Sequence, residues 1–292
     1  MCSSDQAGNK TISFSAALEL LFSLITFFEP REKSHHDLPE LIALENIRGD
    51  LHLHSKWTDG NSSILEIVRA CKARGYQYCA ITDHSKAVRV AGGLMPGDYR
   101  KQWKEIEQAR TKVSGITVFS GCEVDILPDG SLDLSDDLLD EFDWVVAAVH
   151  SKMDMPQSEM TKRVLKALTH PAVNVLAHPT GRLINEREPF AIDLEAIFNA
   201  AKQNEVAIEL NAQPDRLDLS DVHLLRAREI GVKIAINTDA HNAEQLRFMK
   251  YGIDQARRGW LEKANVLNAM SCRELESWRK ERRHRFIRAL AS

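Results

Sequence analysis

The strongest constraint on the fold of this chain is an alternation of short apolar runs and longer amphipathic stretches, which continues from about residue 37 to the C-terminus. Short apolar runs between turn residues are typical of buried strands, and stretches with an apolar residue every three or four positions are typical of covering helices. Alternating units of this kind predict an α/β protein, a distorted TIM-like (βα)7 barrel. The predicted strands are Ile47–Leu53, Tyr78–Thr82, Thr117–Val124, Trp144–Val149, Val173–Ala177, Val206–Leu210 and Lys233–Asn237. The predicted helices are Ser63–Arg74, Asp98–Val113, Gln157–Thr169, Asp193–Gln203, Ser220–Ile230, Gln245–Arg257 and a last one from Ser271, with Ser63 and Ser220 as N-caps.

Metal-ligand-type residues lie at or just beyond the C-terminal ends of these strands. Six imidazoles and three carboxylates suit zinc, manganese or iron, whereas calcium prefers oxygen ligands alone. Nine ligands exceed the needs of one ion and fit a cluster of two or three ions. Because the C-terminal face of a βα barrel carries the active site, the pattern predicts metal-assisted hydrolysis there. The nine residues are His52, His54, Asp59, His84, Glu123, His150, His178, Asp239 and His241.

Two of the motifs place a pair of ligands on one face of a strand. His52 and His54 are two residues apart, as are Asp239 and His241, and such side chains point the same way from a strand. The two pairs fall on the first and last predicted strands, which become neighbours if the barrel closes. Asp59 follows in a turn and can curl back over the same face, although an ordinary Asp-Gly turn remains the alternative.

The remaining ligand candidates each follow an apolar run. Glu123 is the candidate to bridge two cations, since a carboxylate can do so and an imidazole cannot. Any one of His84, His150 and His178 could be a buried core histidine, but the complete set favours metal binding. We expect Asp83 to support the site without binding metal directly. The five histidines for which we expect no ligand role are His35, His36, His170, His223 and His284.

Composition places the chain among folded globular proteins. Of its 292 residues, 43% are hydrophobic and 27% are charged. The net charge of -4 shows no global bias toward nucleic acid, although local patches matter more than the total. The five cysteines form no CxxC pair, which favours a reduced, cytoplasmic compartment.

The first 36 residues are expected to form an apolar helix and a linker, ahead of a catalytic domain over residues 37–292. The segment Ile12–Phe28 is rich in Leu and Phe but carries Glu19 near its middle, and Pro30 marks the linker. A central carboxylate is costly inside a membrane, so we expect no membrane span. We expect an amphipathic helix that docks on the domain, on a second copy or on a protein partner; a membrane anchor or signal is the alternative.

The ordered set H-x-H, D, D-H, E, H, H-P, D-x-H resembles the PHP (polymerase and histidinol phosphatase) family from about Asp37 onward. It is most similar to the PHP domain at the end of bacterial family X DNA polymerases. The stretches that carry this resemblance are residues 38–42, 47–52, 80–85, 123–126 and 178–182. Two departures are visible. The family's usual Ala-Asn-Gly-Leu reads Ala-Gly-Gly-Leu over residues 91–94, so the side chain of that Asn is missing here. Nothing upstream is long enough for a polymerase domain, so we expect no DNA synthesis.

The resemblance implies a trinuclear centre. One ion would be held by His52, His54, Glu123 and Asp239, a second by Glu123, His150 and His178, and a third by Asp59, His84 and His241. The ions would be manganese or zinc, with iron as a further option. The residues expected to be catalytic are Glu123, His150, Asp239 and Asp59.

Cations close to the ligands are candidates for holding a phosphate. Lys86, Lys152 and Arg182 each follow a ligand closely, although solvated loop charges are the equal alternative. Trp57 could stack on a base, but a packed core position is slightly favoured. The basic tail, residues 279–285, could follow a nucleic-acid backbone, but a solvated helix end is the more common case.

Three functions compete at this stage. The first is an exonuclease or 3′-end-processing phosphoesterase in DNA repair, the second a phosphatase for a small metabolite such as histidinol phosphate. The third is a metal-stabilised scaffold without enzyme activity. The complete ligand set argues against the scaffold, while the sequence does not decide between the first two.

Overall fold

The computed structural model describes the backbone of residues 39–290 and the side chains of residues 39–285. The predicted helix Ile12–Phe28 and its linker lie outside the described residues. Among the helices of the described part, none is both long and apolar enough to cross a membrane.

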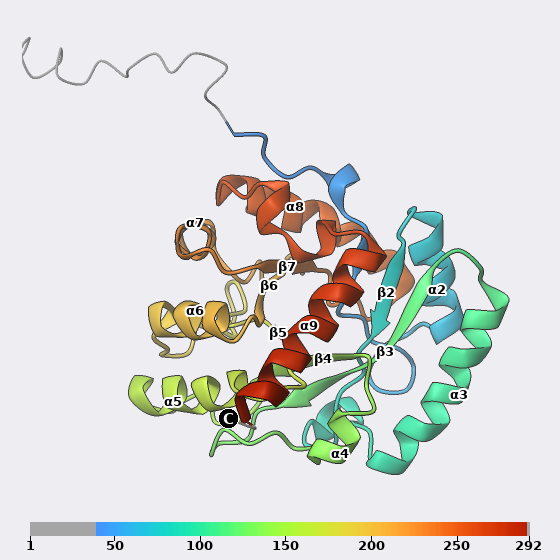
Figure 1. The fold of residues 1–292 in the computed structure, drawn as a ribbon, viewed down its shortest axis with the longest axis horizontal. Helices are drawn as coiled ribbons and strands as arrows, with labels where there is room; N and C mark the ends of the chain where they lie inside the picture. Colours follow the sequence, from blue (N-terminus) through green and yellow to red (C-terminus); the bar gives the residue numbers. More distant parts are fainter. Residues whose placement is uncertain (1–38, 291–292) are drawn as a thin grey trace, which may run out of the picture. The chain divides into compact units, whose positions relative to one another are not determined.

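Seven parallel strands form a nearly closed barrel in sequential order, as predicted (Figure 1). The gap between the first and last strands is bridged by a parallel pairing of Leu53 with Ala240, and the His54 N–H donates to the Ala240 carbonyl at 2.9 Å. The Thr238 hydroxyl adds a bond to Asp50 Oδ2 at 2.6 Å. The strands are β1 Gly49–Asp50, β2 Tyr78–Ile81, β3 Thr117–Asp125, β4 Trp144–Ala148, β5 Val175–Leu176, β6 Ala207–Asn211 and β7 Ile234–Asn237.

Two strands are shorter than predicted because the chain leaves regular pairing where ligand-type residues begin. β1 ends at Asp50, and a bend at Leu51 separates it from the bridge at Leu53. β5 ends at Leu176, and His178 has a φ of 28°, outside the extended region. The His178 N–H donates to Glu209 Oε2 at 2.8 Å. In a regular strand this N–H would donate to a backbone carbonyl of the neighbouring strand.

Helices follow most strands and surround the barrel (Figure 1). Both predicted N-caps are confirmed: Ser63 Oγ accepts from the Glu66 N–H and Ser220 Oγ from the His223 N–H. The prediction of one helix over 245–257 was wrong at its start, because the Asn242 side chain caps a separate 3-10 turn by accepting from the N–H groups of Glu244 and Gln245. The helices are α2 Ile64–Ala73, α3 Pro96–Lys112, α4 Asp136–Leu139, α5 Gln157–Leu168, α6 Leu194–Gln203, α7 Asp221–Ile230, α8 Met249–Arg258 and α9 Cys272–Leu290. The 3-10 turns are η2 Leu44–Asn46, η3 Arg89–Ala91, η4 Ala243–Phe248, η5 Lys263–Asn265 and η6 Leu267–Ala269.

The long helix α9 covers the N-terminal ends of the strands (Figure 1). Its Leu275 is buried in one cluster with Tyr78 and Trp144, which begin β2 and β4. Arg279 Nη1 donates to the carbonyl of Asp143, the residue before β4, at 2.6 Å. The opposite, C-terminal ends of the strands are therefore left to carry the ligand-type side chains.

Candidate metal centre

The carboxylate of Glu123 lies at the centre of the nine predicted ligands. Its Oε2 is 3.4 Å from His52 Nε2, 3.5 Å from His54 Nε2 and 2.8 Å from His84 Nδ1. Its other oxygen, Oε1, is 3.2 Å from His150 Nε2 and 2.9 Å from His178 Nε2. One carboxylate thus faces imidazoles on both sides, which is the arrangement of a bridging ligand.

Asp239 completes the group on the Oε2 side of Glu123. Its Oδ1 is 3.1 Å from His54 Nε2 and 3.7 Å from His52 Nε2. Asp239 has a φ of 51°, a costly conformation for a residue with a side chain. The turn directs the carboxylate back to the two histidines of the first strand, across the closure of the barrel.

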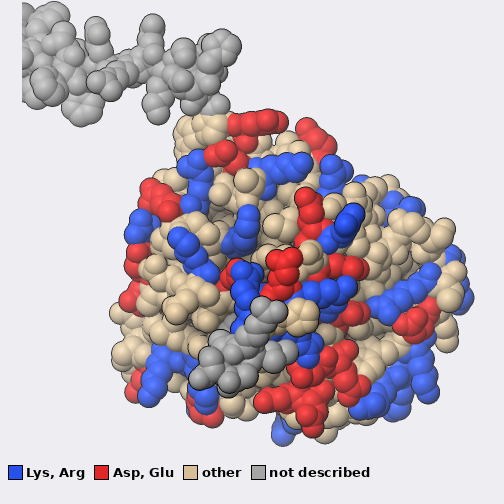
Figure 2. All heavy atoms as spheres, in the orientation of Figure 1, with Lys and Arg blue, Asp and Glu red and all other residues tan. Residues whose placement is uncertain are grey.

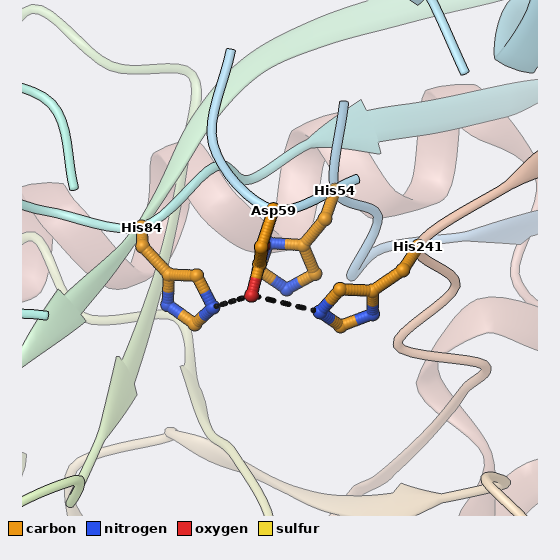
Figure 3. A group of neighbouring side chains, drawn as sticks. All are labelled: His54, Asp59, His84 and His241. Carbon is orange, nitrogen blue, oxygen red and sulfur yellow. Dashed lines mark ion pairs between the residues drawn. The ribbon is translucent and has the colours of Figure 1, made fainter. Parts of the chain in front are cut away.

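A third group gathers around Asp59, at the more exposed side of the site (Figure 3). Asp59 Oδ2 is 3.4 Å from His84 Nε2 and 3.3 Å from His241 Nε2. The His54 ring lies between the two other imidazoles, with its centroid 4.4 Å from each. The side chains of Asp59 and His241 are 34% and 29% exposed, whereas His54 is fully buried, so this group forms the open edge of the cluster.

The residues fit divalent cations on two independent observations. Five side chains of the cluster carry buried nitrogen or oxygen atoms without any hydrogen-bond partner: His52, His54, His84, Glu123 and His178. Leaving such atoms unpaired is expensive unless they bind an ion. Donor atoms around a tetrahedral ion with bonds of about 2.0–2.1 Å are separated by roughly 3.3 Å, which matches most of the distances above. Three overlapping groups of this kind occur among the described residues.

The pKa values of the cluster side chains show which of them carry charge. Burial raises the pKa of Glu123 and of Asp239, but the surrounding imidazoles outweigh burial and hold both pKa values well below the usual range. Burial, reinforced by His84 and His241, lowers the pKa of His54 to about 3, so this ring stays neutral. Burial lowers the pKa of His84 and of His241, but the nearby carboxylates outweigh it and raise these pKa values to about 10 and about 9, so both rings are protonated when no cation is present. Metal binding would displace these protons, because neutral imidazoles and ionised carboxylates are the forms that bind metal.

Three of the imidazoles are oriented by an acceptor on their second nitrogen. His52 Nδ1 lies 2.8 Å from Glu209 Oε1, His150 Nδ1 lies 3.1 Å from Asp125 Oδ1, and His241 Nδ1 lies 2.8 Å from the Asp239 carbonyl. Such contacts fix which nitrogen faces the metal. The sequence analysis missed Glu209. The available signal was an acidic residue near the end of the sixth strand, the one strand to which no ligand was assigned.

Asp83 supports the loop that carries Asp59, in line with the expected supporting role. Its carboxylate accepts from the Ser55 N–H and hydroxyl at 2.7 and 2.6 Å, and from the Thr58 hydroxyl at 2.7 Å. Gly60 closes this loop against the strand, because a Cβ there would lie 2.4 Å from the His54 carbonyl oxygen.

The three cations that the sequence suggested for phosphate binding, Lys86, Lys152 and Arg182, make no hydrogen bond or ion pair with the cluster among the described residues. Lys86 and Lys152 are exposed. Arg182 donates through Nε to the Arg216 carbonyl at 2.8 Å and through Nη2 to the Leu217 carbonyl, so its guanidinium braces a loop. Trp57 packs against the core, and its Nε1 donates to Glu105 Oε2 at 2.7 Å, which favours the packed position over base stacking.

The basic tail is tied to the opposite end of the barrel. Arg282 is 1% exposed and donates to the carbonyls of Pro171 and Asn204, which precede β5 and β6. Arg283 pairs with Asp140 at 2.6 Å. Acidic and basic side chains are interspersed on this face (Figure 2). The expectation of a solvated helix end was therefore wrong for Arg282, and the tail lies far along the barrel from the cluster.

Comparison with known proteins agrees with this geometry. Residues 50–213 match the family described as PHP domain. The chain is 47% identical to the DNA polymerase/3'-5' exonuclease PolX of Bacillus subtilis (strain 168) over 248 residues, which is 85% of the chain but 44% of that protein, so the chain spans less than half of its length. It is 29% identical over 205 residues to a protein named a probable phosphatase from Thermoanaerobacter sp. (strain X514), covering 66% of the chain and 78% of that protein.

The fold is shared with solved structures, one of which holds ligands. It is the histidinol phosphate phosphatase of Lactococcus lactis subsp. lactis Il1403, complexed with zinc, L-histidinol and phosphate. The TM-score is 0.52 at 19% identity, over 72% of this chain and 93% of the other.

Proposed function

The chain belongs to the PHP domain family, and from that premise we propose that it is a metal-dependent phosphoesterase that acts on the 3′ ends of DNA as a 3′-5′ exonuclease. The observation that carries the proposal is the clustering of nine ligand-type residues at the C-terminal face of the barrel, where five imidazoles surround the carboxylate of Glu123. A cluster with this donor set is suited to hydrolysis.

We assign the cluster residues to two or three manganese or zinc ions as the family resemblance implies, and the proximity of these side chains supports the assignment. His52, His54, Glu123 and Asp239 would hold the first, Glu123, His150 and His178 the second, and Asp59, His84 and His241 the third. When bound, such ions lower the pKa of water toward about 7 and neutralise the oxygens of a phosphoryl group.

The protein supplies orientation and access. Glu209 and Asp125 accept from the outward nitrogens of His52 and His150, so the inward nitrogens keep their lone pairs for metal. The side chains of His150, His241 and Asp59 are 19%, 29% and 34% exposed, while Glu123 is 1% exposed. A phosphoester would therefore approach from the side of these three residues, with Glu123 and Asp239 beneath it.

DNA is supported as the substrate by identity to a named exonuclease. The 47% match to PolX extends over most of the chain and includes the metal cluster. A phosphatase of small esters is the second candidate, supported by the relative named a probable phosphatase, most of whose length the chain covers.

The test compares two substrates on manganese-loaded protein. One is a DNA oligonucleotide labelled so that stepwise loss from its 3′ end is visible, and the other is histidinol phosphate. Stepwise shortening of the DNA supports the proposal, and phosphate release from the small ester alone would transfer the function to the second candidate. The matched control is Glu123→Gln, which should lose whichever activity the wild type has.

A further inference from the structure

A cavity of about 350 Å³ adjoins the metal cluster, and three arginines are among the residues that line it: Arg89, which is exposed, and Arg187 and Arg216, which are half-buried. His150 and His178 of the cluster line the same cavity, together with Asp125. Val88, Val149 and Met153 supply an apolar wall. Its size and its mixture of apolar surface with a few charged groups are those of a small-ligand site.

Arg216 has a guanidinium nitrogen that makes no hydrogen bond within the described residues. Its Nη1 is buried without a hydrogen-bond partner, and its one ion pair within residues 39–285 is a 3.8 Å approach of Nε to Asp239 Oδ2, too long for a hydrogen bond. Asp239 in turn faces His52 and His54 through its other oxygen. The Arg216 side chain is 20% exposed, so it can be reached from the cavity, and a buried guanidinium nitrogen is costly to leave unpaired. An anion from outside the chain is therefore the natural partner.

Arg187 places a second guanidinium near the first. Its Nε donates to the Gly181 carbonyl at 2.8 Å, which fixes the arm of the side chain. Arg187 and Arg216 line the same cavity, and burial together with the charge of Arg216 lowers the pKa of Arg187. Two like charges beside a cation-binding cluster repel one another unless an anion lies between them.

The loops are braced so that this arrangement is kept. Arg182 donates to the carbonyls of Arg216 and Leu217, and Asp218 accepts from the N–H groups of Thr180 and Gly181. These bonds join the loop after β5 to the loop after β6. Arg182, which the sequence suggested as a phosphate ligand, instead holds the loop that presents Arg216.

We infer that Arg187 and Arg216 bind the phosphoryl group of the substrate in the cavity between them and His150 and His178. The inference rests on the proposed phosphoesterase function and adds which residues recognise its phosphate. A guanidinium matches phosphate oxygens with paired N–H donors, and two of them in the same cavity as the metal ligands would hold the group alongside the ions. The apolar wall is left for the organic part of the ester.

The experiment measures binding of inorganic phosphate to the metal-loaded chain by titration calorimetry, with metal content determined for every variant. We expect Arg216→Gln and Arg187→Gln each to weaken phosphate binding roughly ten- to hundredfold, as for the loss of a charged hydrogen bond, with metal content unchanged. Arg216→Lys should recover only part of the affinity, because an ammonium lacks the paired donors. The matched control is Arg226→Gln, whose guanidinium pairs with Glu195 and Glu229 between α6 and α7.

The outcomes separate this inference from the proposed function. Phosphate affinity within about threefold of wild type in both Gln variants, or no phosphate binding by the wild type, would overturn the arginine site even if hydrolysis is found. Arginine-dependent phosphate binding by a chain that hydrolyses neither test substrate would leave the arginine site standing and remove the proposed function. If Arg216→Gln does not fold, Arg187→Gln and Arg216→Lys carry the test.

Discussion

At the scale of single residues, the site depends on which atom of each side chain faces the cluster. Glu123 offers one oxygen to each side, so no neutral side chain of similar size can replace both contacts. Glu209 is fully buried and accepts from His52 Nδ1, the His178 N–H and the side-chain amide of Asn237. Glu123 would bind metal, and Glu209 positions two of the other expected ligands, His52 and His178.

Replacement of the bridging carboxylate should remove activity without unfolding the chain. We expect Glu123→Gln to lower the hydrolysis rate by more than about 100-fold and to lower metal content, because the bridging charge is lost. Activity, metal analysis and circular dichroism measure the three effects. Glu159→Gln, an exposed change on α5, is the control. Full activity in Glu123→Gln would refute the metal mechanism.

Replacement of the acceptor behind His52 should weaken metal binding while leaving all nine ligands in place. We expect Glu209→Gln to reduce metal affinity by about 10- to 100-fold. The side-chain amide can turn its nitrogen toward His52 Nδ1, and the imidazole ring then loses the acceptor that fixes its orientation. Competition with a chelator of known affinity gives the value. An affinity equal to that of the wild type would show that Glu209 acts only in packing.

At the scale of elements, the two ends of the barrel have separate tasks. The loops after the strands carry the cluster, while α9 closes the N-terminal ends through Leu275 and three arginines. Arg282 satisfies carbonyls that precede β5 and β6, and burial lowers its own pKa to about 10, so it remains charged at neutral pH. The tail therefore acts as a structural anchor.

Truncation of that anchor should cost stability and spare the metal site. We expect Arg282→Ala to reduce the free energy of unfolding by roughly 2–4 kcal/mol, because buried carbonyls lose a charged donor. Arg285→Ala, whose side chain is 58% exposed, should change it by less than about 1 kcal/mol. Urea unfolding measures both. A loss of metal from Arg282→Ala without a loss of stability would contradict this assignment.

At the scale of the whole molecule, the cluster joins strands from both ends of the described chain. Carboxylates and imidazoles from β1 to β7 converge on a small volume, and the ions they bind would act as cross-links across the closure of the barrel. Binding to the folded state alone raises stability by mass action. Metal and fold should therefore be thermodynamically linked.

Removal of metal should lower the melting temperature. At metal concentrations about 1,000-fold above Kd, metal binding adds roughly 4 kcal/mol to the free energy of unfolding. We therefore expect EDTA to lower Tm by on the order of 10 °C and added manganese to restore it. Differential scanning calorimetry measures the shift. Glu123→Gln should respond much less to EDTA, and an equal response would place the stabilising ion elsewhere.

The sequence by itself determined the barrel class, the order of its strands and the residues of the cluster. Strand and helix periods are local properties, and ligand-type residues can be recognised just after apolar runs, as His84 is after Tyr78–Ile81. The approximate boundaries held for most elements because N-caps such as Ser63 and Ser220 act within a few residues. They failed where a side chain replaced a backbone partner, as at His178 and Asn242.

Only the tertiary structure decided which polar groups serve the cluster and which serve the fold. Arg182, Arg216 and Arg282 are alike in sequence, yet one braces a loop, one keeps a buried unpaired donor beside the cluster and one anchors α9. Glu209 became visible only as the partner of His52, 157 positions away in the chain. The physical reason is that a charge takes its role from the groups around it, and those groups come together only when the barrel closes.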